Sequence, residues 1–278
     1  HAFSGSVLLS QVTIPTSVTS IGNYAFSNCD SLTQITIPSS VTSIGYLSFY
    51  RCHSLTSILT DPNNSHFTSI DGILYSNDKN TLLFYPNGLE LCPFTIPSNV
   101  TSIGHFAFYE CQKLSEIEIP SSVTSIGNFA FRHCEKLSEI EIPSSVTSIG
   151  KYAFAECSNL SDIEIPSIAF LGNYAFLGCK KLSKITLPSS ITSIGIGTFS
   201  YSSLKKIAIP SSVQFISNKA FHHCDSLTRI TIPSSVISIG DAAFSECHSL
   251  KTIEIPSSVT SIGDAAFSEC HSLKTIEI

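Results

Sequence analysis

One unit of 23 residues recurs along almost the whole chain and constrains its fold more than any single residue does. Read from each proline, the unit is P-S-S-V-T-S-I-G-x-x-A-F-x-x-C-x-x-L-x-x-I-x-I. A fixed period between about 20 and 50 residues is the signature of a solenoid, in which each coil contacts only its neighbours. The coils begin at Pro15, Pro38, Pro97, Pro120, Pro143, Pro166, Pro188, Pro210, Pro233 and Pro256.

The segment L-x-x-I-x-I predicts one β-strand in each coil. In one copy Leu32, Ile35 and Ile37 alternate with polar residues and should point inward. The proline that follows ends the strand, because it has no N–H to donate to a ladder. Stacked coils then place these strands side by side, about 4.8 Å apart, in a parallel main sheet.

The rest of the unit predicts the other walls of the coil. Val41 and Ile44 of S-V-T-S-I should form a second, shorter strand on the opposite wall. The glycine that follows is expected to supply a positive φ at the corner. A short helical or 3₁₀ turn is expected to hold A-F-x-x-C, whose phenylalanines should form one continuous inner stack: Phe26, Phe49, Phe108, Phe131, Phe154, Phe176, Phe199, Phe221, Phe244 and Phe267.

Residues 59–97 form a longer coil of about 36 residues in place of 23, counted from the repeat period. Asp71-Gly72 is a strong two-residue hairpin signal, and residues 77–80 predict a second turn. We therefore expect a β-hairpin excursion there. The chain is expected to rejoin the stack at Leu91, Phe94 and Ile96.

These patterns predict a single solenoid domain over residues 1–278, with twelve strand rungs between Leu9 and Ile278. The chain starts inside a coil and stops on a strand, and neither end supplies the polar cap that a solenoid needs. We therefore expect the sequence to be a piece of a longer protein. The sequence begins at His1 without a signal-peptide pattern, and we expect that any leader was removed or lies outside this piece.

Composition excludes several classes of protein. Charged residues make up only 13% of the chain and the net charge is −6, which is too little basic charge for a nucleic-acid binder. Hydrophobic residues make up 42%, which is too many for a disordered chain. No apolar run approaches 18 residues, so the sequence predicts no transmembrane segment.

The repeat resembles the BspA-like, or treponemal-type, leucine-rich repeats. The copy I-G-N-Y-A-F-S-N-C-D-S-L-T-Q-I-T-I-P at Ile21 to Pro38 carries the resemblance, which covers essentially the whole chain. The resemblance implies a curved right-handed solenoid from secreted or surface-anchored proteins of host-associated microbes, used in adhesion. It also implies that the repeats have no enzymatic activity of their own.

Nine of the ten cysteines share one position in the repeat and should point into the interior as free thiols. Parallel Cβ vectors in a ladder do not easily give the torsion of a disulfide, so a buried column of small apolar side chains is expected. Cys92 lies outside this column, beside Pro93, and is expected to be partly exposed. The column comprises Cys29, Cys52, Cys111, Cys134, Cys157, Cys179, Cys224, Cys247 and Cys270.

The sequence predicts no metal site, no cofactor and no enzyme. Adjacent His and Cys, as in His223-Cys224 and Cys247-His248, should face opposite sides, whereas zinc ligands must converge. The chain contains no G-x-S-x-G, H-E-x-x-H, P-loop or dinucleotide-binding motif in context. Its many Ser and Thr residues recur at the turns and strand surfaces of each coil, where they are solvated.

The exposed positions of the main sheet carry segregated charge. Three consecutive rungs hold six carboxylates on strands about 4.8 Å apart, and the following rungs are basic. This pattern suits a polar protein partner or weak Ca²⁺ binding, and an ordinary solvated face remains the alternative. The candidate binding residues are Glu116, Glu118, Glu139, Glu141, Asp162, Glu164, Lys184, Lys205 and Lys206.

A second candidate surface is a column of aromatic residues two positions after the glycine. Half-exposed aromatic side chains are good interface anchors, although packing between coils is the favoured interpretation. Its members are Tyr24, Phe106, Phe129, Tyr152 and Tyr174.

Two functional hypotheses remain open. The first is a non-enzymatic adhesion module at the cell surface or outside the cell, which binds a host-cell or extracellular-matrix protein through the solenoid face. The second is a structural or intracellular scaffold repeat with no external ligand. The extracellular location follows from the family resemblance alone, and fold does not fix the partner.

Overall fold

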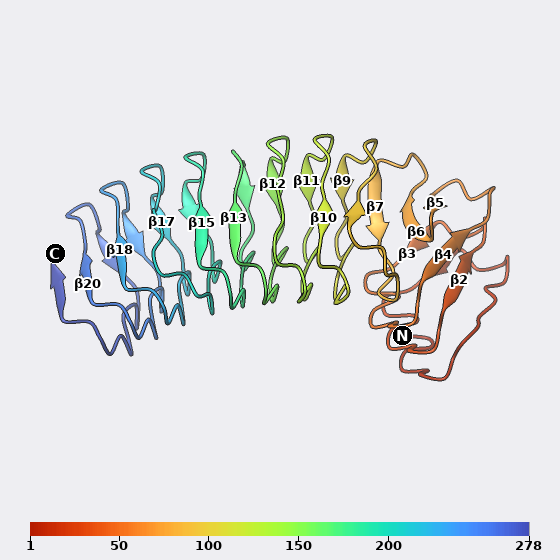
Figure 1. The fold of residues 1–278 in the computed structure, drawn as a ribbon, viewed down its shortest axis with the longest axis horizontal. Coiled ribbons are helices and arrows are strands. Elements are labelled where there is room, and N and C mark those ends of the chain that lie inside the picture. The colour runs from red at the N-terminus through yellow and green to blue at the C-terminus, as the bar shows by residue number, and fades with distance from the viewer. Residues whose placement is uncertain (278) are drawn as a thin grey trace.

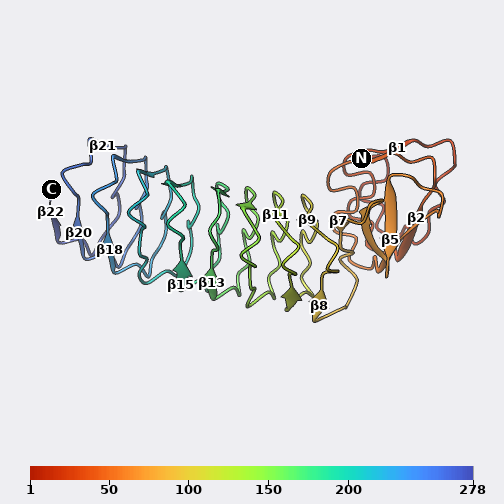
Figure 2. The ribbon, with the colours of Figure 1, turned by 90° about the horizontal axis from the view of Figure 1, so that it is seen from above.

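The computed structural model describes residues 1–277 and forms a β-solenoid whose coils stack along one long axis (Figure 1). All of its regular elements are strands, and no helix occurs within the described residues. The first coils are turned out of line with the remaining stack, and the longer coil lies at the bend (Figures 1 and 2). None of the described segments forms a helix with the length and hydropathy that a bilayer crossing requires.

The main sheet forms as the L-x-x-I-x-I segments predict, with inward and outward residues alternating along each strand. Gln34, Ile35, Thr36 and Ile37, for example, are exposed, buried, exposed and buried in turn. Neighbouring rungs pair in parallel with equivalent residues opposite each other, as Ile230 and Ile253 do. The strands are β2 (Gln34–Ile37), β4 (Ser57–Thr60), β8 (Phe94–Thr95), β10 (Ile117–Glu118), β13 (Asp162–Glu164), β15 (Lys184–Thr186), β18 (Arg229–Thr231), β20 (Thr252–Glu254) and β22 (Thr275–Glu277).

Three of the twelve predicted rungs, over residues 9–14, 138–142 and 204–209, are not strands. The second and third still bury alternate side chains, whereas Leu9, Val12 and Ile14 of the first are partly buried. Ile140 and Ile142 are buried while Glu139 and Glu141 are exposed, and Ala208 makes a single parallel bridge to Thr231.

The second wall consists of two-residue strands, one for each S-I step of the repeat. Their side chains also pair in register, with Ile126 opposite Ile149 and Ile103. These strands are β1 (Ser20–Ile21), β3 (Ser43–Ile44), β9 (Ser102–Ile103), β11 (Ser125–Ile126), β12 (Ser148–Ile149), β14 (Phe170–Leu171), β16 (Ser193–Ile194), β17 (Phe215–Ile216), β19 (Ser238–Ile239) and β21 (Ser261–Ile262).

The A-F-x-x-C segments are chains of overlapping turns, so the predicted helical or 3₁₀ turns are corrected. Two residues in each segment have a positive φ, as Phe129 (58°) and His133 (60°) do, and a right-handed helix cannot continue through them. The turns form a third ladder between coils. In one coil the amide of Phe131 donates to the carbonyl of Ala153, at 2.8 Å.

The repeated glycine has a different role from the one predicted. Gly127 and its equivalents do not have a positive φ, which occurs two residues later. A Cβ on Gly127 would lie 2.7 Å from the carbonyl carbon of Gly104 and from the amide of His105. Glycine is therefore favoured at this corner because neighbouring coils approach closely there, and Ser217 is the exception in one coil.

The interior is built from columns of equivalent side chains. Phenylalanine rings of successive coils stack nearly parallel, with centroids 4.9 Å apart for Phe108 and Phe131. The in-register cysteines are free and lie beside this stack. The thiol of Cys134 donates to the carbonyl of Phe108 at 3.1 Å, and equivalent bonds recur along the chain. Where the cysteine is missing, Ser202 takes its place and is buried.

The longer coil contains the predicted hairpin. Strands β5 (Phe67–Ile70) and β6 (Ile73–Ser76) pair antiparallel around Asp71 and Gly72, which both have a positive φ. Strand β7 (Thr81–Phe84) pairs antiparallel with β6 and parallel with β9, so it returns the chain to the second wall.

Phe94 and Ile96 rejoin the core as predicted, but Leu91 does not. Leu91 is 43% exposed. Tyr85 occupies the inner position that phenylalanine holds in other coils, and its amide donates to the carbonyl of Ala107. Its hydroxyl donates to the carbonyl of Leu91 at 3.0 Å, which is an interaction phenylalanine could not make.

Strand β6 separates two hydrophobic clusters, and the prediction of one continuous phenylalanine stack is wrong at this point. Ile73 and Tyr75 face the cluster of the later coils, whereas Leu74 faces the cluster of the first coils. One stack ends at Phe49, whose ring meets the edge of Phe84, and a second begins with Phe108. Because the interior is divided into two clusters, the assignment of residues 1–278 to a single solenoid domain stays a prediction.

An ion pair joins the two parts of the stack across the longer coil. Arg51 binds both carboxylate oxygens of Glu110, with its Nε 3.0 Å from Oε2 and its Nη2 3.3 Å from Oε1. Glu110 is buried, and the hydroxyl of Tyr50 donates to it at 3.1 Å. Burial and the Glu110 carboxylate together raise the pKa of Tyr50 to about 12, so its proton is retained for this bond.

The thiols give the first testable prediction. Partial burial raises the pKa of Cys92, but hydrogen bonds from Ser115 outweigh this effect and lower the pKa below its usual value. Burial raises the pKa of Cys52 and of Cys224 to about 12. A thiol reagent at neutral pH should therefore label one rapid equivalent in the native protein and all ten cysteines in denaturant without reductant. A rapid equivalent that persists after Cys92→Ser, or fewer than ten in denaturant, would contradict this assignment.

The ion pair gives the second prediction. Arg51→Met should lower the free energy of unfolding by about 1–3 kcal/mol, because it leaves the buried carboxylate of Glu110 without its cation. Urea unfolding measures this loss. The double variant Arg51→Met, Glu110→Gln should recover part of it, since the uncompensated charge is gone. Equal losses in both variants would show that the charge of Glu110 is not what Arg51 stabilises.

Candidate binding surface on the main sheet

All nine charged residues predicted for the main sheet have exposed side chains. The six carboxylates line a shallow trough of about 1000 Å³, which extends from Pro93 and Thr95 to Lys184 and Thr186. Lys184 lies at the basic end of this trough, opposite Asp162 on the neighbouring strand. Lys205 and Lys206 lie on the next rung, beyond the residues that line it. The trough is polar and open, which suits an extended partner better than a small enclosed ligand.

The main sheet loses its ladder where the acidic charge is densest. Strand β10 pairs only with β8, and β13 pairs only with β15. The rung that carries Glu139 and Glu141 lies between them and forms no strand. Carboxylates on neighbouring strands repel, and like charges directly opposite each other destabilise a sheet. The gap therefore lies where this repulsion is strongest.

Sequence reasoning missed the polar groups that surround the carboxylates. The hydroxyl of Thr95 donates to Glu118 at 3.1 Å, and Ser144 and Ser167 line the trough beside the prolines that end their rungs. The repeat supplies the signal for them, because Ser follows Pro in most copies. These groups add hydrogen-bonding capacity to the charged floor of the trough.

The aromatic column is half-buried and divided into two parts. Phe106, Phe129, Tyr152 and Tyr174 stack on one another, with ring centroids 4.6 to 5.0 Å apart. Tyr24 lies in the first coils and stacks on His1 instead. The stacking gives a physical basis for packing between coils, and the outer ring edges stay available as a candidate surface. Arg132 covers part of this surface, 5.4 Å from the ring of Tyr152.

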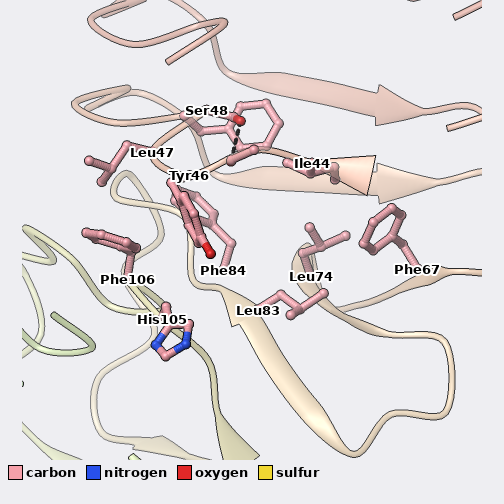
Figure 3. A pocket seen from close by; sticks show the side chains of 12 residues that line it. Ile44, Tyr46, Leu47, Ser48, Phe67, Leu74, Leu83, Phe84, His105 and Phe106 are labelled. Atoms are coloured by element: carbon pink, nitrogen blue, oxygen red, sulfur yellow. Dashed lines mark hydrogen bonds between the residues drawn. The ribbon is translucent and has the colours of Figure 1, made fainter. Parts of the chain in front are cut away.

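A small apolar pocket of about 180 Å³ lies at the bend between the first coils and the longer coil (Figure 3). Tyr46, Phe84 and Phe106 lie on one side of it, and Leu74 and Phe67 on the other. It forms where the second wall is interrupted, because β3 pairs with β1 only. Its volume is below the range of about 300–1,000 Å³ that is usual for ligand sites.

Adjacent histidines and cysteines face opposite sides, as predicted. Cys224 and Cys247 are buried, whereas His223 and His248 lie at the surface of the turn segments. Cysteine and histidine therefore do not converge on one point in these pairs. Within residues 1–277, the groups close enough to share an ion contain histidine, and none is formed by the carboxylates of the trough.

The geometry defines a leucine-rich repeat solenoid, with one parallel rung per coil and a leucine, isoleucine and phenylalanine interior. The chain belongs to the BspA type leucine rich repeat region family, whose model matches residues 1–91, 80–202 and 169–278. No curated protein matches the chain.

Several solved structures are similar. A leucine-rich repeat protein from Eubacterium ventriosum is 29% identical, with 94% of this chain and 65% of that chain covered and a TM-score of 0.67. The pneumococcal vaccine antigen PcpA is also 29% identical, with coverage of 77% and 58% and a TM-score of 0.66. A leucine-rich repeat protein from Bacteroides ovatus is 28% identical, with coverage of 87% and 62% and a TM-score of 0.61. This chain thus spans less than two thirds of the length of each of them.

The gap in the main sheet gives the third prediction. Replacing Glu139 and Glu141 by Thr, the residue at equivalent positions of other rungs, should stabilise the protein by about 0.2–1 kcal/mol for each repulsive pair removed. A higher urea midpoint at low ionic strength measures this gain. Lys184→Thr is the control, and it should not stabilise, because it removes a cation opposite Asp162. A lower midpoint for the Thr variant would show that repulsion does not open the ladder.

Proposed function

We propose that the chain is a non-enzymatic adhesion module, displayed at the cell surface or outside the cell, that binds a protein through the main sheet. The observation that carries this proposal is the trough, in which six exposed carboxylates lie on three neighbouring rungs. Solenoids present extended surfaces to partners, and segregated charge gives such a surface selectivity and a fast on-rate.

The proposed partner is a host-cell or extracellular-matrix protein with a basic, extended segment. Such a segment can place cations along Glu118, Glu141 and Glu164, whose side chains repeat along the stack. The basic rungs that carry Lys184, Lys205 and Lys206 would then favour a partner in which an acidic region follows the basic segment. The description of PcpA as a vaccine antigen supports display outside the cell.

The alternative is a structural or intracellular scaffold repeat, for which the charged face is only solvated. The two functions differ in whether charge at the trough controls binding. The stacked aromatic column from Phe106 to Tyr174 is the second surface to test, since its ring edges are half-exposed.

Charge reversal provides the fourth prediction. Binding to immobilised matrix proteins should weaken at least tenfold, or about 1.4 kcal/mol, in the triple variant Glu118→Lys, Glu141→Lys, Glu164→Lys. Binding by the unaltered chain should also weaken with added salt, because exposed charges are screened over about 8 Å at physiological ionic strength. Surface-based binding assays at several salt concentrations measure both effects.

A matched control reverses three exposed carboxylates away from the trough, with the same change in net charge: Asp30→Lys, Glu135→Lys, Asp264→Lys. The control should bind as the unaltered chain does. Equal weakening in both triple variants would mean that net charge alone acts. Unchanged binding in the trough variant, with thermal unfolding showing an intact fold, would overturn the assignment of the trough.

A further inference from the structure

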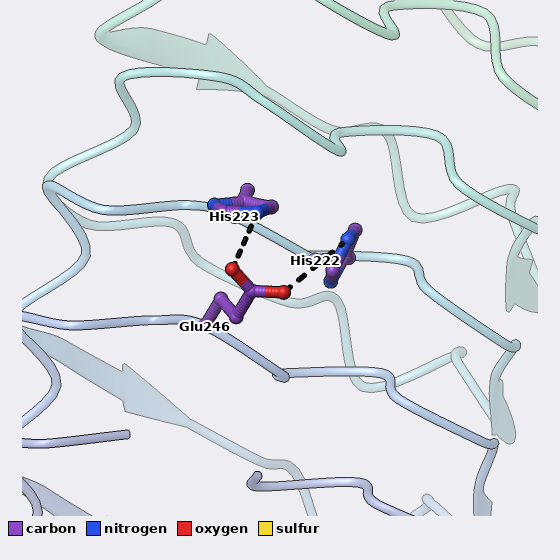
Figure 4. Close-up of side chains that lie close together, drawn as sticks. All are labelled: His222, His223 and Glu246. Carbon is purple, nitrogen blue, oxygen red and sulfur yellow. Dashed lines mark ion pairs between the residues drawn. The ribbon is translucent and has the colours of Figure 1, made fainter. Parts of the chain in front are cut away.

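Two histidines and a glutamate converge on the turn edge, away from the trough. Glu246 follows His223 by one repeat, so stacking places it beside that residue. The Nε2 atom of His223 lies 2.5 Å from Oε2 of Glu246, and Nε2 of His222 lies 4.0 Å from Oε1. The three ligand atoms lie within 4.8 Å of one another. Figure 4 shows both imidazole rings turned toward the carboxylate.

The cluster is partly shielded and held by its backbone. The side chains of His222, His223 and Glu246 are 16%, 25% and 32% exposed. The ring of Tyr201 stacks on His223 and meets His222 edge-on, with centroids 4.6 and 5.4 Å away. His223 and Glu246 both have a positive φ, which fixes the direction of their side chains from adjacent coils.

Metal ligation requires neutral imidazole, and the surroundings of His222 favour that form. Burial lowers the pKa of His222, and the neighbouring His223 lowers it further, against a smaller opposite effect of Glu246. The Nδ1 atom of His222 is buried against the backbone of Ser245 and makes no hydrogen bond of good geometry. The other ring nitrogen of His222, Nε2, faces the carboxylate of Glu246 and is the atom that would bind the ion.

We propose that His222, His223 and Glu246 bind one divalent transition-metal ion, with zinc as the representative. Imidazole and carboxylate suit this class of ion, and two histidines with one glutamate leave a fourth position for water. Zinc binds nitrogen and oxygen at about 2.0–2.2 Å, so the ligand atoms must lie about 3.3 Å apart. The two distances from histidine to Glu246, 2.5 and 4.0 Å, lie on either side of this value, so ion binding would lengthen one and shorten the other.

Asp225 completes the site as a positioning residue. Its Oδ1 lies 3.7 Å from Nδ1 of His223, on the side of the ring opposite Glu246. A ligating histidine usually donates its other N–H to a carboxylate, which fixes its tautomer and orientation. His248 is an alternative ligand, and its Nε2 lies 3.9 Å from Oδ1 of Asp225. Its Nδ1 is hydrogen-bonded to the carbonyl of Glu269.

Another coil of the same chain shows why the site is specific to this position. His133 and Glu156 occupy the positions of His223 and Glu246, but Arg132 stands where the site has His222. Arg132 brings a fixed positive charge and no lone pair, so this coil cannot hold a cation in the same way. It provides a natural control.

The fifth prediction uses zinc alone as the probe, measured by calorimetry on untagged, chelator-stripped protein. All proteins carry Cys92→Ser, which removes the exposed thiol as a competing ligand. The unaltered cluster should bind one zinc per chain. His222→Ser introduces the residue that the next two coils have at this position, and it should weaken binding more than tenfold. Asp225→Asn should weaken it by about 10- to 100-fold as well, because it removes the orienting carboxylate.

His133→Asn is the matched control and should leave zinc affinity unchanged. Circular dichroism confirms that each variant keeps its fold. Absence of zinc binding in the unaltered cluster would overturn the proposal and leave an ordinary ion pair between His223 and Glu246. Unchanged affinity after His222→Ser would overturn it too, since zinc would then bind elsewhere.

Discussion

The close approach of neighbouring coils at the glycine corner is the constraint on which the rest of the structure depends. A Cβ on Gly127 would meet the backbone of the preceding coil at 2.7 Å, so glycine recurs at this corner, and Ser217 takes its place in one coil. With the backbones in contact there, the other walls are held in register by their own ladders, and the phenylalanine rings stack at about 5 Å. The thiols of in-register cysteines then reach the phenylalanine carbonyl of the previous coil, and Cys111 reaches the carbonyl of Tyr85 instead. Each coil is therefore stabilised by its neighbours, and stability accumulates along the stack.

This packing has an energetic cost at the turn edge. Most coils contain two non-glycine residues with a positive φ, such as Phe129 and His133, and each costs roughly 1–2 kcal/mol in L-residues. The strain is offset because those conformations aim three amides of most coils at carbonyls of the next one. Gly197 and Gly178 occupy such positions in two coils, where the cost is absent. The side chains at the strained positions vary between coils, from aromatic rings to histidine and glutamate.

Sequence periodicity predicts the structural features that recur in each coil, and it predicts less well the features of the longer coil, where the repeat is broken. The buried columns, nine of the twelve strand rungs and the Asp71-Gly72 hairpin follow from the apolar pattern and turn residues, as the structure confirms. The sign of φ at Gly127 does not follow, because glycine serves equally for a positive φ and for close packing. The contact of Arg51 with Glu110, 59 residues apart, depends on how the longer coil folds, and no repeat pattern encodes that. The exposed charges of the trough were predictable because each rung repeats the same alternation, whereas the lost ladder around Glu139 required the pairing itself.

The same lattice produces both candidate sites. A 23-residue period places like positions of successive coils side by side, so identical residues become neighbours whether or not they attract. At the trough this brings carboxylates together, and the repulsion coincides with one of the three rungs that form no strand. At the turn edge it brings imidazole beside carboxylate, which is a complementary pair. In the proposed function, a cationic segment laid along the trough would reduce the repulsion between rungs. Binding and completion of the main-sheet ladder would then favour each other, because both depend on neutralising the same carboxylates.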